Sequence, residues 1–298
     1  MFCCDQPNST VQEHEQIVDP PRTDVAQPAV DRSLEQPSDV GSIQLSEAAV
    51  VDPAPIANWT AEERQSVREV RAALLAKGVP EGELGEIELI TITLNSKCRV
   101  DEAVEKFITY REKLLQEYGI EDVWADWEEL HGQWHRLTVA GLDEGGRQIM
   151  WVGGGGTPVA EERVCIRACC LYFFAVHADV HTLRNGITLC INTANNSAKI
   201  GNEKKLQVAW QNFPTRPQAI FILGTTAITR VFINALIAFA SLFAKNKVVA
   251  RIRFATVADV AKRVGNASLP EQEGGDKRMP TEAWIKERLA AFPLMGLH

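Results

Sequence analysis

The stretch Gln218-Ala219-Ile220-Phe221-Ile222-Leu223 is short, apolar and rich in residues that favour β-strands. The sequence predicts a second strand before it, at Ile187–Asn192, and a third after it, at Ala250–Phe254. Helical patterns separate the three strands, at Glu203–Asn212 and Ile228–Lys245. Because strands that alternate with helices need crossover connections, we predict an α/β fold with a mainly parallel sheet and flanking helices.

The pattern extends in both directions from this core. Upstream, His135–Val139 and Arg147–Val152 read as two strands around the turn Asp143-Glu144-Gly145-Gly146. A long helix is predicted at Val159–Leu183, between these strands and the next one. Further helices are predicted downstream, at Val257–Val264 and Thr281–Phe292.

A small all-α unit is predicted at residues 59–119. Thr60 and Glu63 form the pattern of a capping box, which opens a helix that ends at Gly78. Two more helices are predicted at Glu83–Leu94 and Val100–Tyr118, the last of them stopped by glycine.

Composition and charge divide the chain again. It has 298 residues, 45% of them hydrophobic and 23% charged, which is typical of a soluble globular protein. The formal net charge is -8, and residues 1–58 hold ten acidic and two basic residues, so the whole excess lies there. This stretch is Pro-rich and lacks apolar periodicity, so we expect a disordered acidic tail. The expected domains are 1–58, 59–119, 120–278 and a C-terminal helix at 279–298, with no nucleic-acid partner.

The cysteines and the apolar segments bear on location. The chain has seven cysteines, and Met1–Thr10 has no apolar signal segment, so we expect a cytoplasmic protein with free thiols. Cys3 and Cys4 are adjacent and could both be acylated, although no apolar or basic flank supports that anchor. The apolar run between Arg230 and Lys245 has too few residues to span a bilayer.

Patterns that point to catalysis or metal binding are incomplete. The glycine run Gly153–Gly156 lacks the Lys-Ser or Lys-Thr of a phosphate loop, which favours a linker. Two histidine pairs have helical spacing, and a thiol with a neighbouring histidine could act as a nucleophile, but neither arrangement has a complete motif. We therefore expect no catalytic residue, no metal and no cofactor. The residues weighed for these roles are His131, His135, His177, His181, Cys165, Cys169 and Cys170.

The segment Ile228–Lys245 is apolar on nearly all sides of a helix. Such a helix is either a central core helix or one that faces lipid on one side, and the pattern alone leaves both open. Its most prominent stripe, at helical spacing, is Phe232, Leu236, Phe239 and Phe243.

Five motifs, in order and at plausible gaps, resemble those of the CRAL-TRIO lipid-binding domain and of the small helical domain that precedes it. They include an Asp-x-x-Gly-Arg turn, a Gly-Ile strand start, an Asn-Phe-Pro-x-Arg helix end and a Leu-Pro-x-x-x-Gly-Gly ending. Together they cover about residues 59–278. The matching stretches are Ser96–Ala103, Leu142–Arg147, Asn185–Leu189, Asn212–Arg216 and Leu269–Gly275.

This resemblance implies a bowl with a sheet as its floor, a pocket for one lipid and an apolar helix as a gate. Ile228–Lys245 would be the gate, with its stripe lining the pocket or touching membrane. In the phosphatidylinositol-transfer branch, two cations, a Glu and a Thr hold the headgroup. The matching positions are Lys97, Thr215, Val248 and Arg251, so both cations are kept while Thr215 replaces the Glu and Val248 the Thr.

The resemblance therefore implies a non-catalytic lipid-binding or lipid-transfer protein, cytoplasmic and peripherally associated with membranes. Its bound lipid would be phosphatidylinositol or another hydrophobic ligand, and its other partner a transient membrane surface. Two departures from the family pattern leave the ligand open: Gly224-Thr225-Thr226 replaces Asn-x-Pro, and Asn192 stands where Asp is usual. One alternative is a membrane-recruitment or protein-interaction scaffold on the same fold; another is a thiol- or metal-dependent enzyme.

Overall fold

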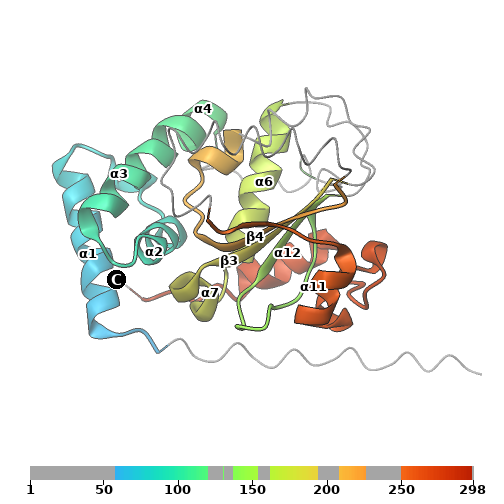
Figure 1. Ribbon diagram of the computed structural model, residues 1–298. Helices are drawn as coiled ribbons and strands as arrows, with labels where there is room; N and C mark the ends of the chain where they lie inside the picture. The colour runs from blue at the N-terminus through green and yellow to red at the C-terminus, as the bar shows by residue number, and fades with distance from the viewer. Residues whose placement is uncertain are drawn as a thin grey trace, which may run out of the picture. The chain divides into compact units, whose positions relative to one another are not determined.

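The computed structural model describes residues 58–119, 130, 137–153, 162–193, 208–225 and 250–296 (Figure 1). Residues 1–57 of the predicted acidic tail lie outside this set, as do Cys3 and Cys4. The predicted gate helix Ile228–Lys245 lies outside it too, together with Val248.

A five-stranded mixed sheet forms the centre of the described structure, in the order β1-β2-β3-β4-β5. β1 runs antiparallel to β2, and all the later neighbours are parallel. The predicted α/β fold with a mainly parallel sheet and flanking helices is confirmed. The strands are β1 (Leu137–Thr138), β2 (Ile149–Gly153), β3 (Ile187–Asn192), β4 (Pro217–Leu223) and β5 (Ile252–Phe254).

Hydrophobic residues cover both faces of this sheet, because successive side chains of a strand point to opposite sides. On β3, for example, Leu189 belongs to the larger core, which includes helices α6 (Glu162–Val176) and α12 (Thr281–Ala290). The next residue, Cys190, belongs to a smaller cluster on the other face, with Val260 of helix α11 (Val257–Val264). The near-continuous apolar strands are thus explained by burial on two sides.

The N-terminal helices agree with the local signals in the sequence. In α1 (Ala61–Ala76), both hydrogen bonds of the Thr60–Glu63 capping box are present. The chain then forms α2 (Glu86–Asn95), which begins three residues later than predicted because Glu81–Glu83 form a 3-10 turn. The third predicted helix is α3 (Val100–Tyr110), which continues through a π-helical turn at Arg111–Leu115 and α4 (Gln116–Tyr118) and ends at Gly119, whose φ is 64°.

The prediction of one helix over Val159–Leu183 is wrong. α6 ends at Val176, and a separate helix, α7 (Val180–Asn185), begins after a short break. The cause is Asp179, whose carboxylate accepts a hydrogen bond from the backbone N–H of Thr182 at 2.6 Å and so caps the new helix. His177 and His181 therefore do not share one helix face.

The Asp-x-x-Gly-Arg turn ties the β-hairpin to the centre of the sheet. One carboxylate oxygen of Asp143 accepts hydrogen bonds from the backbone N–H groups of Gly145 and Arg147, at 2.8 and 2.9 Å. The other accepts from Arg147 Nε at 2.8 Å and from the hydroxyl of Thr188, on β3, at 2.6 Å. Burial acts to raise the pKa of Asp143, but the bonds from Thr188 and Arg147 outweigh it and lower that pKa. The motif thus has a structural role.

Candidate functional site

The first predicted headgroup residue, Lys97, lies just after the C-terminal end of α2 and is exposed. Its φ is 57° and that of Cys98 is 56°, so two consecutive non-glycine residues adopt the left-handed conformation. Such a conformation costs about 1 kcal/mol or more for a residue with a side chain. The Lys97 backbone N–H donates to the Leu94 carbonyl at 2.8 Å, which closes the helix end.

Arg216 ends the Asn-Phe-Pro-x-Arg motif and is a half-buried cation of this region that the sequence does not assign to the headgroup site. Its half-buried guanidinium donates to the carbonyls of Leu94, at 3.3 Å, and of Arg184. Burial lowers the pKa of Arg216, and the neighbouring charges of Arg251 and Arg99 lower it further. Both burial and nearby positive charge disfavour the protonated form of a cation.

Arg251, the second predicted headgroup cation, directly precedes β5. Its side chain donates to the Pro217 carbonyl at 2.7 Å, and its own carbonyl accepts from Ile220, so it is fixed between β4 and β5. Across the described part of the chain, no carboxylate forms an ion pair with Arg216 or Arg251. We call Arg99, Arg216 and Arg251 the cation group.

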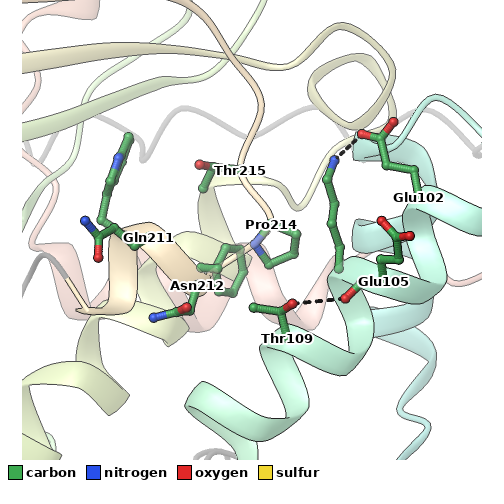
Figure 2. A pocket seen from close by; sticks show the side chains of 10 residues that line it. Glu102, Glu105, Thr109, Gln211, Asn212, Pro214 and Thr215 are labelled. Atoms are coloured by element: carbon green, nitrogen blue, oxygen red, sulfur yellow. Dashed lines mark hydrogen bonds and ion pairs between the residues drawn. The ribbon is translucent and has the colours of Figure 1, made fainter. Parts of the chain in front are cut away.

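Thr215, the third predicted headgroup residue, lines a cleft of about 350 Å³ between α3 and residues 210–215 (Figure 2). Glu102 and Glu105 lie on the α3 side, opposite Pro214 and Thr215. Lys106 forms an ion pair with Glu102 at 2.8 Å. The remaining lining residues are Thr109, Trp210, Gln211, Asn212 and Phe213.

The cation group and the cleft are neighbours. Arg99, whose charge acts on Arg216, also forms an ion pair with Glu102 at the side of the cleft. Lys97 borders the cation group, since its backbone and the Arg216 guanidinium both donate to the Leu94 carbonyl. The structure thus brings three separate chain segments to one place.

One predicted part of the site lies outside the described residues, and one residue of the observed site was not predicted. The predicted gate residues Phe232, Leu236, Phe239 and Phe243 lie outside the described residues. Arg216, by contrast, was missed although it is the last residue of the Asn-Phe-Pro-x-Arg motif. That motif was interpreted only as the end of a helix, and no local pattern shows that its arginine reaches α2.

The cysteines weighed as nucleophiles are buried in α6. A hydrogen bond with Cys165, together with burial, raises the pKa of the Cys169 thiol well above its usual value. Burial, with a smaller contribution from Cys165, raises the pKa of Cys170, and burial raises that of Cys190 on β3 to about 12. Since the thiolate is the nucleophile, these positions favour the unreactive form.

The histidines weighed as bases or ligands have structural contacts. His177 is fully buried, with Nδ1 2.7 Å from the Phe173 carbonyl oxygen, and burial lowers its pKa to about 4. His181 is exposed, with Nε2 2.7 Å from the Gly145 carbonyl oxygen. His131 and His135 lie outside the described residues. Of the side chains that the structure describes, no three from His, Cys, Asp and Glu gather where they could hold a metal ion.

None of the described helices combines the length and the apolar character that crossing a membrane requires. No protein-family model matches the chain, and a search of curated proteins finds no match either. The resemblance to CRAL-TRIO domains therefore rests on the sequence motifs.

Proposed function

We propose that this protein binds one lipid and transfers it between membranes without catalysing a reaction. The observation that carries the proposal is the cation group. Its members Arg216 and Arg251 are half-buried and have no carboxylate paired with them among the described residues, and Arg216 Nε is buried without a hydrogen-bond partner there. An anion at this place relieves the repulsion between the arginines. The phosphate of a phospholipid headgroup is such an anion.

Arginine suits this task because its planar guanidinium binds phosphate through two parallel hydrogen bonds. Arg216 and Arg251 already donate to backbone carbonyls, so their positions are fixed before a ligand arrives. Little side-chain freedom is then lost on binding. Lys97 adds a flexible, exposed cation at the border of the same group.

The apolar part of the proposal rests on the sequence. Residues 231–244 form an apolar run, and the chain resembles a family that holds lipid tails above a sheet. The hydrogen-bonded Asp143 turn and the mixed sheet are consistent with that resemblance. The resemblance also implies phosphatidylinositol as a ligand, and the cleft beside Thr215 has room for a headgroup.

The test is lipid transfer from donor vesicles of phosphatidylcholine that contain phosphatidylinositol, with each lipid labelled in turn. Lys97→Gln with Arg251→Gln should slow transfer about tenfold or more, because charge-assisted bonds contribute roughly 1.5–3 kcal/mol each. Arg253→Gln is the matched control, because Arg253 is an exposed cation on β5, two residues after Arg251, and does not belong to the cation group. Equal transfer by the double variant and the control contradicts the phosphate site.

Vesicle sedimentation, combined with the transfer assay, distinguishes the scaffold alternative from lipid transfer. A membrane-recruitment module binds vesicles in a sedimentation experiment but removes no lipid from them. A transfer protein moves labelled lipid to acceptor vesicles in proportion to its own concentration.

A further inference from the structure

The position of Arg216 depends on the end of α7. Its guanidinium donates to the carbonyl of Arg184, the second-last residue of that helix. The chain after α7 passes so closely that a Cβ on Gly186 would lie 2.2 Å from the Arg216 carbonyl oxygen. That oxygen also accepts a hydrogen bond from the backbone N–H of Ile187, at 3.1 Å. The end of α7 therefore fixes both the backbone and the side chain of Arg216.

The side chain of Arg184 ties this end of α7 to the beginning of α1. Its Nε and Nη2 atoms donate to the two carboxylate oxygens of Glu63, at 2.6 and 2.8 Å. Nη2 also donates to the Asn58 carbonyl at 2.8 Å. The side chain of Glu63 is only 9% exposed in this pair, and a bidentate pair holds both partners in a defined geometry.

Trp59 and the C-terminal segment support the same contact. The Arg184 guanidinium lies over the Trp59 ring, with 5.8 Å from its central carbon to the ring centroid. Trp59 is buried, and its Nε1 donates to the Leu294 carbonyl at 3.3 Å, which holds the ring in place. We call Trp59, Glu63 and Arg184 the clasp.

Arg216 needs such support because burying a charged group is unfavourable unless hydrogen bonds compensate for the lost water. No carboxylate pairs with it in the part of the chain that the structure describes. Its bonds to the carbonyls of Leu94 and Arg184 supply the compensation instead. A shift of α7 removes the second of these bonds.

We propose that Arg184 is a positioning residue for the cation group. The clasp holds the end of α7, and the Arg184 carbonyl holds the Arg216 guanidinium in the orientation that binds an anion. This inference rests on the proposed function for the identity of the anion, a lipid phosphate. The position of Arg216 itself is measurable without any ligand.

The first test follows the exchange of the Arg216 Nε hydrogen with water, in NMR spectra of the full chain. Glu63→Gln removes the charge from the clasp but keeps the capping box, because glutamine also accepts the bond from the Thr60 backbone. This variant should speed the exchange about fivefold, since the ion pair that it breaks is partly exposed. Glu83→Gln is the matched control, because Glu83 forms a similar bidentate pair with Arg111 and takes no part in the clasp.

The second test measures the binding of inorganic phosphate to the full chain by calorimetry. Loss of a negative charge near the cation group would by itself strengthen the binding of an anion. The clasp predicts the opposite sign. Glu63→Gln should weaken phosphate binding about threefold, and Glu83→Gln should leave it unchanged.

Faster exchange at Arg216 together with weaker phosphate binding supports the inference. It is overturned if Arg216 exchanges equally fast in Glu63→Gln and Glu83→Gln, or if Glu63→Gln binds phosphate at least as tightly as the wild type. If the wild type binds no phosphate, the exchange alone decides the role of the clasp. Faster exchange with lipid transfer that is insensitive to Lys97→Gln and Arg251→Gln supports the clasp and contradicts the proposed function.

Discussion

Two regions of the molecule carry residues that the sequence marks for chemistry, and they differ in their exposure to water. The first is α6 and the residue after its end, with Cys165, Cys169, Cys170 and His177, all of them buried. The second is the cation group with the adjoining cleft, where charged groups are half-buried or exposed. In the first region burial favours the neutral forms of the titratable groups; in the second the charged groups are partly open to water.

The difference between the two regions shows that residue type is a weak guide to function until burial is known. A thiol and an imidazole eight residues apart suggest a nucleophile and its base. In the structure they fill a core, where the Phe173 carbonyl lies within hydrogen-bond distance of His177 Nδ1. Arg216, at the end of a helix-ending motif, suggests no function from its sequence position. Its half-buried place near Arg251 and Arg99 is the reason to propose an anion there.

The largest effect that this difference predicts concerns the thiols. Cys165, Cys169, Cys170 and Cys190 should react with a thiol reagent at least about a thousandfold more slowly in the native protein than in urea, because labelling requires opening of the core. Peptide mapping after labelling measures each position separately. Rapid native labelling of Cys169 would contradict its place in the buried region.

The next effect concerns the aromatic residue that joins the two regions. Phe213→Ala should lower the free energy of unfolding by about 3–5 kcal/mol, since the ring packs against Tyr110, Phe173, Phe174 and His177. Urea denaturation measures the loss. Thr215→Ala, two residues later and on the cleft, should change stability little. Similar losses for the two variants would remove the distinction between core and cleft.

His177 predicts a pH dependence with a defined sign. Its pKa is about 4 in the folded protein and about 6.5 in the unfolded chain, so the unfolded chain binds the proton first. The contribution of the neutral imidazole to stability is fully present above pH 6.5. As the pH drops from 6.5 towards 4, the free energy of unfolding falls by roughly 3 kcal/mol.

The His177→Gln variant should lose this part of the pH dependence. The difference between the unfolding free energies of wild type and variant, measured from about pH 7 to about pH 4.5, isolates it from the carboxylates. A difference that stays constant over this range would mean that the imidazole is accessible to protons in the native state.

The smallest effect concerns the backbone under Lys97. Lys97→Gly should stabilise the fold by about 1 kcal/mol, because glycine adopts a φ of 57° without strain. Lys97→Ala should give no such gain, while both variants lose the cation. If Lys97→Gly is more stable but binds lipid more weakly, the lysine is kept for its charge. An unchanged melting temperature for Lys97→Gly would argue against backbone strain at this position.

The sequence predicts the elements whose signals are local. The capping box at Thr60, the glycine stops and the apolar strands are all in the structure. The break at Asp179 was missed, since one capping aspartate interrupts an otherwise continuous helical pattern. Arg216 was missed for a different reason. Its partner carbonyl belongs to Leu94, far away in the chain, and no periodicity records a contact of that kind.

The central claim, that the chain carries a lipid, is tested most directly by native mass spectrometry of the full-length protein after incubation with mixed vesicles of phosphatidylcholine and phosphatidylinositol. We expect one phospholipid per chain, identified by extraction. The bound fraction should be reduced by the Lys97→Gln/Arg251→Gln variant but not by Arg253→Gln. A chain that remains lipid-free after exposure to both lipids would contradict the claim.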